Sequence, residues 1–61
     1  MIKLIDVVDT SYPIYISVPE HNKSAGQYTY EMYNAEKHKD YLYRNVDSLD
    51  YTMQGVVVYL V

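Results

Sequence analysis

The last seven residues constrain the fold of this chain more than any other segment. Residues 55–61 read GVVVYLV, in which a glycine is followed only by apolar and aromatic side chains. β-Branched residues favour strands, and a strand that is apolar on both faces must be covered on both faces. We therefore expect a central strand here, or a strand that meets its copy in another subunit. The second possibility predicts self-association through Val56, Val58 and Leu60.

The length of the chain adds to this constraint. A chain of 61 residues forms one domain at most, here 1–61, and buries only about 60% of the surface that its unfolded form exposes. There is no cysteine, so a disulfide cannot add stability. Self-association is a common source of extra stability in domains of this size. We therefore expect a homo-oligomer, most simply a dimer.

Three more strands are predicted from composition and alternation. Residues 2–8, IKLIDVV, are aliphatic and end at the turn-forming cluster Asp9-Thr10-Ser11. Residues 13–18 place one set of side chains on a single face: Ile14, Ile16 and Val18. Residues 27–34 do the same with a second set: Tyr28, Tyr30 and Met32. We expect the two sets to meet, because side chains alternate between the faces of a strand.

Residues 35–53 decide the fold class. Apolar residues recur there at helical spacing, but the tyrosines and β-branched residues of 41–52 are weak helix formers. We predict a short helix at 35–41 and a strand at 43–52 with a bulge near Asp47. The fold is then mainly β, with five mostly antiparallel strands in a curved sheet or small open barrel. The alternative is a four-stranded sheet with one long helix at 35–53.

Two connections carry clear turn signals. The segment 19–26, PEHNKSAG, is polar and lies between a proline and a glycine, so we expect a mobile hairpin loop. Gln54-Gly55 precedes the last strand, and glycine accepts the positive φ that a tight turn requires.

Tyrosine supplies all nine aromatic residues. Its apolar ring suits a half-buried sheet, and its hydroxyl suits an interface with a partner. We predict a binding surface at three residues that oppose the expected core set: Tyr15, Glu31 and Tyr33. The alternative interpretation is that they are ordinary solvated sheet residues.

The charge distribution excludes several classes of partner. The net charge is −3, and the cations between residues 37 and 44 are interleaved with acids, which disfavours direct binding of nucleic acid. The acids are spread too evenly for DNA mimicry. The first residues lack the apolar core of a signal peptide, and the longest apolar run is too short to span a membrane. We expect a cytoplasmic protein.

Groups that could support chemistry are few. Glu20, His21 and Ser24 include the residue types of a hydrolytic set, but one loop positions such groups poorly. A metal site could draw on four residues, which do not converge on one helix face: His21, Glu36, His38 and Asp40. We therefore predict a protein that is not an enzyme and that needs neither a cofactor nor a metal.

The last third of the chain resembles small β proteins of phages that infect Gram-positive bacteria. In those chains a helical turn with a leucine leads into V-x-S-[IL], then a turn and an apolar terminal strand. Leu42, Val46, Ser48, Leu49 and the run 56–60 occupy this pattern, and IKLIDVV resembles the first strand of those proteins. The resemblance implies an accessory protein of the host cytoplasm that binds and blocks a host or defence component.

Three functions follow from these observations. The first is a non-enzymatic protein-binding module, expected as a homodimer, that inhibits or modulates a partner through its tyrosines and the 19–26 loop. The second is an oligomeric sponge in which tyrosines stack on a nucleotide signal, with phosphate neutralised by Lys37, Lys39 or Arg44. The third is a structural subunit that donates a strand to a larger assembly.

Overall fold

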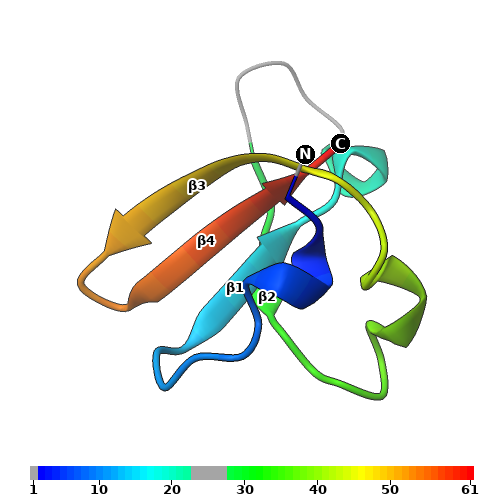
Figure 1. Cartoon of the computed structure of the whole chain (residues 1–61). Coiled ribbons are helices and arrows are strands. Elements are labelled where there is room, and N and C mark those ends of the chain that lie inside the picture. Colours follow the sequence, from blue (N-terminus) through cyan, green and yellow to red (C-terminus); the bar gives the residue numbers. More distant parts are fainter. Residues whose placement is uncertain (1, 23–27) are drawn as a thin grey trace.

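The computed structural model describes residues 2–22 and 28–61, and the fold is mainly β. Within these ranges four strands form one open sheet: β1 (Ile14–Ser17), β2 (Glu31–Met32), β3 (Val46–Thr52) and β4 (Gly55–Leu60). Their order across the sheet is β2-β1-β4-β3 (Figure 1). Three-residue 3-10 turns precede the first strand or lie between strands: η1 (Leu4–Asp6) before β1, η2 (Pro19–His21) before β2 and η3 (Lys39–Tyr41) before β3. The β-rich prediction is confirmed, but the prediction of five strands is wrong.

β4 is a central strand, as the terminal apolar run predicts. It pairs with β3 in antiparallel orientation, with Val58 opposite Leu49. It also pairs with β1 in parallel orientation, with Val58 beside Ile16. The sheet is therefore mixed, because β1 and β2 pair antiparallel while β1 and β4 do not.

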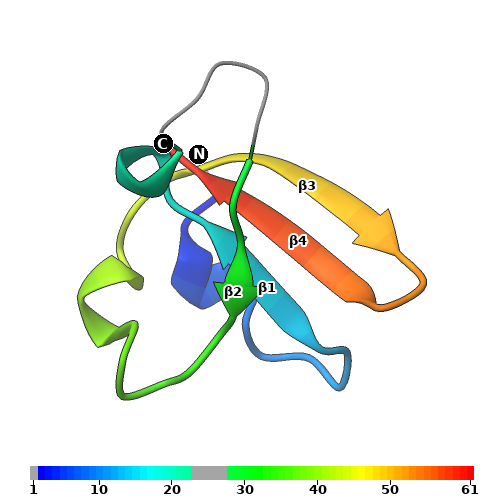
Figure 2. The same ribbon diagram turned by 180° about the vertical axis from the view of Figure 1, so that it is seen from behind.

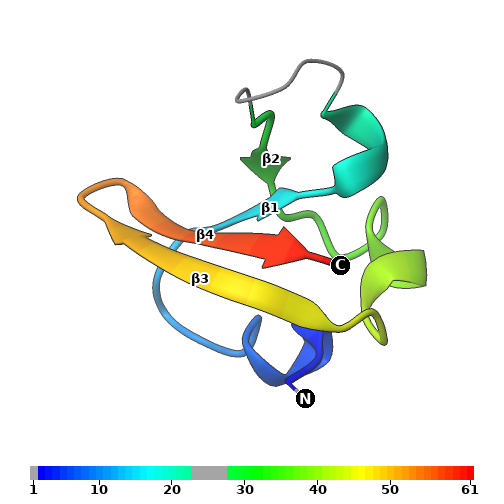
Figure 3. The same cartoon turned by 90° about the horizontal axis from the view of Figure 1, so that it is seen from above.

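One face of the sheet carries the hydrophobic core, and we call it the core face. Its buried side chains are Leu4, Ile14, Ile16, Val18, Val46, Val56, Val58 and Leu60. η1 lies on this side of the sheet and contributes Leu4 (Figure 3). Each such side chain contributes roughly 1.5–3 kcal/mol when it leaves water. The residues predicted for self-association are thus buried within their own chain, and the prediction that they form an intersubunit surface is corrected.

Residues 2–8 do not form the predicted strand. Their backbone bends into η1, where the Asp6 carboxylate accepts a hydrogen bond from the Lys3 backbone N–H at 3.0 Å. Only an isolated bridge between Lys3 and Asn45 retains β pairing. The side chain of Asp6 therefore offers the backbone an alternative to a strand ladder, and the turn directs Leu4 into the core.

The register of β2 overturns the predicted orientation of its residues. Met32 lies opposite Tyr15, and Glu31 lies opposite Ile16. Directly opposed residues in antiparallel strands share a face, so Glu31 is on the core face and Met32 on the other. The prediction that Tyr28, Tyr30 and Met32 meet the aliphatic residues of β1 is wrong, and all three are exposed.

Residues 35–53 contain neither the short nor the long predicted helix. The side-chain oxygen of Asn34 accepts hydrogen bonds from the N–H groups of Glu36 and Lys37, which fixes a turn over 35–38 before η3. β3 then begins at Val46, and its register shifts between Val46 and Ser48, which confirms the bulge predicted near Asp47.

The turn at Gln54-Gly55 is confirmed and also sets the distance between β1 and β4. Gly55 has φ +146°, and a Cβ atom there would lie 2.3 Å from the backbone oxygen of Pro13. That same oxygen accepts a hydrogen bond from the Val56 N–H at 2.9 Å. Glycine is therefore needed for β1 to begin this close to β4.

Within residues 2–22 and 28–61, no helix has the length and apolar character to cross a bilayer.

Candidate functional site

The structure separates the three residues predicted to bind a partner. Tyr15 lies on the face opposite the core. Tyr33 packs against the core and is half-buried. Glu31 bonds to Lys37 at 2.8 Å and to His38 at 2.9 Å. Tyr15, Glu31 and Tyr33 therefore do not form one surface, and Tyr15 alone lies on an open face.

Tyrosines gather on that open face, which we call the tyrosine face and define by Tyr15, Tyr28, Tyr30 and Tyr59. The rings of Tyr15 and Tyr30 lie 5.9 Å apart at 78°, and those of Tyr28 and Tyr59 lie 5.5 Å apart at 76°. Both pairs have the edge-to-face geometry that aromatic rings prefer. Sequence alternation placed Tyr28 and Tyr30 on one side of a strand, but it assigned them to the core.

The aromatic pairs form a thin cover over the sheet. Val57 lies beneath this face with only 3% of its surface exposed, next to Tyr15 in the adjacent strand. Above it, Tyr28 is 65% exposed and Tyr30 is 51% exposed. Seen from behind, the hairpin half of β3 and β4 has no other described segment over it, whereas the chain just before β2 crosses near the end of β4 (Figure 2). The rings of the tyrosine face therefore cover the sheet beneath them, while their outer surfaces are exposed to solvent.

Two carboxylates border the tyrosine face. Asp50 lies opposite Val57, so its side chain shares this face. Asp47 occupies the bulge of β3 and, with Ser48 and the rings of Tyr28 and Tyr59, lines a cavity of about 240 Å³. The face therefore combines aromatic rings with negative charge.

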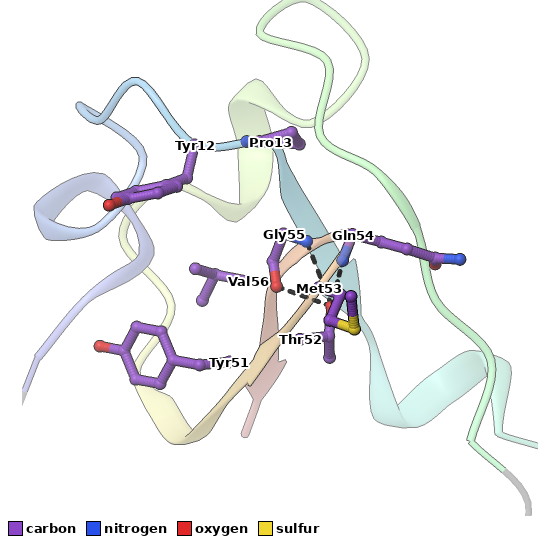
Figure 4. A pocket seen from close by; sticks show the side chains of 8 residues that line it. All are labelled: Tyr12, Pro13, Tyr51, Thr52, Met53, Gln54, Gly55 and Val56. Atoms are coloured by element: carbon purple, nitrogen blue, oxygen red, sulfur yellow. Dashed lines mark hydrogen bonds between the residues drawn. The ribbon is translucent and has the colours of Figure 1, made fainter.

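A second apolar surface lies at the end of the β3–β4 hairpin, and we call it the hairpin-end groove. Tyr12 and Tyr51 form one wall, with Val56 between them, and Met53 and Gln54 lie on the other side (Figure 4). The cavity measures about 440 Å³. The hydroxyl oxygen of Thr52 accepts hydrogen bonds from the N–H groups of Gln54 and Gly55 and donates one to the Gly55 carbonyl, which holds the turn (Figure 4).

His38 is a structural residue that the sequence did not reveal as such. It is 1% exposed and stacks between Tyr33 and Tyr41 at centroid distances of 5.9 and 5.8 Å. Its Nδ1 accepts a hydrogen bond from the Asn34 N–H at 2.8 Å, so the ring proton lies on Nε2 and is donated to Glu31. Both ring nitrogens are occupied, and the side chain is not available to a ligand.

An ion pair joins η2 to the start of β3. Arg44 donates two hydrogen bonds to the Glu20 carboxylate, at 2.7 and 2.9 Å, and lies 5.5 Å from the centroid of the Tyr41 ring. The hydrogen bonds from Arg44 lower the pKa of Glu20 to about 2. Those from Lys37 and His38 lower the pKa of Glu31 to about 2 as well.

The proposed chemical groups are not assembled into a reactive site in the part of the chain described. Glu20 is engaged by Arg44, and Ser24 lies outside the described residues. Among residues 2–22 and 28–61, no group of three or more His, Cys, Asp and Glu side chains could hold a metal ion.

The cations predicted to neutralise the phosphate of a nucleotide are Lys37, Lys39 and Arg44. Lys37 bonds to Glu31 and Arg44 to Glu20, so two of the cations that a nucleotide site would need are occupied by carboxylates. The tyrosine face, with its aromatic pairs and bordering acids, is the candidate functional site. Comparison of the chain with protein-family models, with curated proteins and with solved structures gave no match.

Proposed function

We propose that this chain is a non-enzymatic protein-binding module that engages its partner through the tyrosine face. The observation that supports the proposal is the gathering of four tyrosines on one sheet face, where Tyr28 and Tyr30 remain largely exposed. Tyrosine is enriched in protein interfaces because its ring buries apolar area while its hydroxyl forms hydrogen bonds. It also loses little conformational entropy on binding, since it has only two side-chain torsions.

The resemblance to phage accessory proteins extends this proposal to an inhibitor or modulator of a host or anti-phage defence protein. Such a module acts by covering a surface of its target, so it needs a rigid face rather than a reactive pocket. The edge-to-face pairs supply that rigidity, because each exposed ring is supported by a second ring on the sheet. Self-association through the same face is the competing use of these residues.

The nucleotide sponge and the strand donor have less support. A nucleotide brings phosphate charge, which Asp47 and Asp50 would repel at the tyrosine face. A strand donor needs a terminal strand that is free to leave, whereas β4 is hydrogen-bonded between β1 and β3. We therefore retain the protein-binding module as the proposed function.

Site-specific photo-cross-linking tests this proposal. A photoreactive phenylalanine analogue would replace Tyr30 on the tyrosine face, Tyr51 in the hairpin-end groove, or Tyr43, which is 70% exposed and belongs to neither surface. In the cells where the gene is naturally expressed, we expect a discrete adduct with another protein from position 30 and none from position 43. An adduct only from position 51 would move the site to the hairpin-end groove. An adduct only between copies of the chain would show self-association, and equal adducts or none would overturn the proposal.

A further inference from the structure

The cavity beside Asp47 indicates which chemistry the tyrosine face accepts. Three separate segments meet there: Tyr28 precedes β2, Asp47 and Ser48 belong to β3, and Tyr59 belongs to β4. Its volume of about 240 Å³ exceeds that of a single water molecule several times and suits the end of a long side chain. The aromatic walls favour an apolar or cationic group, and the carboxylate favours a cation.

The β-bulge explains why a carboxylate lies at this position. The register passes from Val46 opposite Leu60 directly to Ser48 opposite Tyr59, so Asp47 is the extra residue of β3. A bulge releases one residue from the ladder and redirects its side chain. Asp47 is exposed and lies on the wall of the cavity beside the tyrosine pair. In a regular strand Asp47 and Ser48 would point to opposite faces, whereas here both line the same cavity.

Charge on this face is one-sided among the residues that the structure describes. The ion pairs in the described part of the chain join Glu31 with Lys37 and His38, and Glu20 with Arg44. None of these pairs includes Asp47 or Asp50, and the chain as a whole has a net charge of −3. The face therefore offers negative charge and electron-rich rings, which complement a cationic partner.

We propose that the partner presents a basic segment to the tyrosine face, and that Tyr28, Tyr59 and Asp47 hold one of its arginine or lysine side chains. A cation within about 6 Å of a tyrosine ring is attracted by the ring's quadrupole, and a carboxylate adds a charge-assisted hydrogen bond. Arginine suits both contacts better than lysine, because its planar guanidinium stacks on a ring while it donates in a fixed fork. This inference rests on the proposed function and adds the chemistry of the partner.

Short peptides test the inference without knowledge of the partner. The ¹⁵N-labelled protein is titrated with a capped nonapeptide of glycine, alanine and tyrosine that carries two arginines, and with the same peptide carrying citrulline, which keeps the shape of arginine but is neutral. We expect the arginine peptide to shift the amide resonances of Asp47, Ser48 and Tyr59. We expect the citrulline peptide to bind roughly three- to tenfold more weakly, as a cation–π contact and an exposed ion pair would give.

Matched variants locate the effect. Asp47→Asn should weaken binding of the arginine peptide by roughly threefold or more. Asp40 is an exposed acid in η3, and Asp40→Asn should leave the affinity for this peptide unchanged. Tyr28→Leu keeps an apolar side chain but removes the ring, and it should weaken binding to a similar degree. Added salt should weaken arginine binding and leave citrulline binding nearly constant.

Three results would overturn the inference: equal binding of arginine and citrulline peptides, equal effects of Asp47→Asn and Asp40→Asn, or resonance shifts confined to another surface. The proposed function fails separately. If cross-linking at position 30 captures another protein but Asp47→Asn leaves that adduct unchanged, the tyrosine face binds a protein and the cationic chemistry is wrong. If the arginine peptide binds at Asp47 but none of the three cross-linking positions gives an adduct with another protein, the protein-binding function is wrong.

Discussion

The two faces of the sheet are built by the same strands but in opposite ways. β4 contributes Val56, Val58 and Leu60 to the core face and Val57 and Tyr59 to the tyrosine face. The core face is closed by aliphatic side chains from η1 and the surrounding turns. Among residues 2–22 and 28–61, the tyrosine face is covered by its own rings, which remain half or more exposed at Tyr28 and Tyr30. One face therefore carries the hydrophobic core, and the other leaves tyrosine rings exposed to solvent.

The largest expected effect comes from truncating the core face. Ile16→Ala should lower the free energy of unfolding by about 2–5 kcal/mol, because Ile16 is 1% exposed and its removal leaves a cavity. A core of this size rarely supplies more than about 3–5 kcal/mol, so the variant should be largely unfolded. Urea denaturation followed by far-ultraviolet circular dichroism measures the change. An equally large loss from Tyr30→Ala would break the distinction between the two faces.

The polar end of the core face gives the next largest effect. His38→Phe keeps the stack with Tyr33 and Tyr41 but leaves the Asn34 N–H without its acceptor. Loss of a partner by a part-buried donor costs about 1–3 kcal/mol, which should appear as a lower urea midpoint. Lys37→Ala serves as the control, because it removes only an exposed partner of Glu31 and should change the midpoint much less. Similar losses in both variants would contradict a structural role for His38.

Truncation on the tyrosine face should have a smaller effect on stability. Tyr28→Ala removes one edge-to-face pair, which contributes about 0.5–1.5 kcal/mol beyond area burial, from a ring that is largely exposed. Tyr28→Phe keeps the ring and should be close to wild type. Thermal unfolding of both variants measures this effect. A loss as large as that from Ile16→Ala would show that the tyrosine face is a second core rather than a recognition surface.

The smallest expected effect is an acid dependence from the ion pairs of Glu20 and Glu31. Glu20 and Glu31 have folded-state pKa values lowered from 4.5 to about 2, so their stabilising contribution is complete above pH 4.5 and is lost as the pH falls towards 2. Both carboxylates are exposed, so the change should be small and should weaken further in salt. The difference in melting temperature between pH 6 and pH 2.5 should shrink in Glu20→Gln. An unchanged difference would show that the bonds to Arg44 do not contribute.

Local signals in the sequence identified several elements correctly. Alternation of Ile14 and Ile16 located β1, the bulge was expected near Asp47, and Gly55 marked the hairpin turn. The strand at 2–8 failed, because hydrophobic composition does not reveal that Asp6 will cap a turn. The structural role of His38 was missed for a similar reason, since its two hydrogen-bond partners and its stacking rings are set by packing.

The sequence indicated that tyrosines would form the candidate site, but it did not identify most of the residues involved. The abundance of tyrosine predicted a recognition surface, and of the three residues named for it only Tyr15 lies on the tyrosine face. The other members were missed because the register of β2 against β1 decides which tyrosines face the solvent. A shift of one residue moves every side chain of a strand to the opposite face. The two residues of β2 are too few to indicate its register from sequence.

The sequence by itself determined that the chain is β-rich and that its last residues form a strand that must be covered on both faces, because these properties depend on local composition and on the need to cover an apolar run. Only the tertiary structure decided that β1 is the parallel neighbour of β4 and that the tyrosines form the open face. Both depend on pairings between residues far apart in the chain, which no local pattern encodes. The apolar terminal run shows that this strand needs neighbours on both faces. The tertiary structure shows that other parts of the same chain supply them.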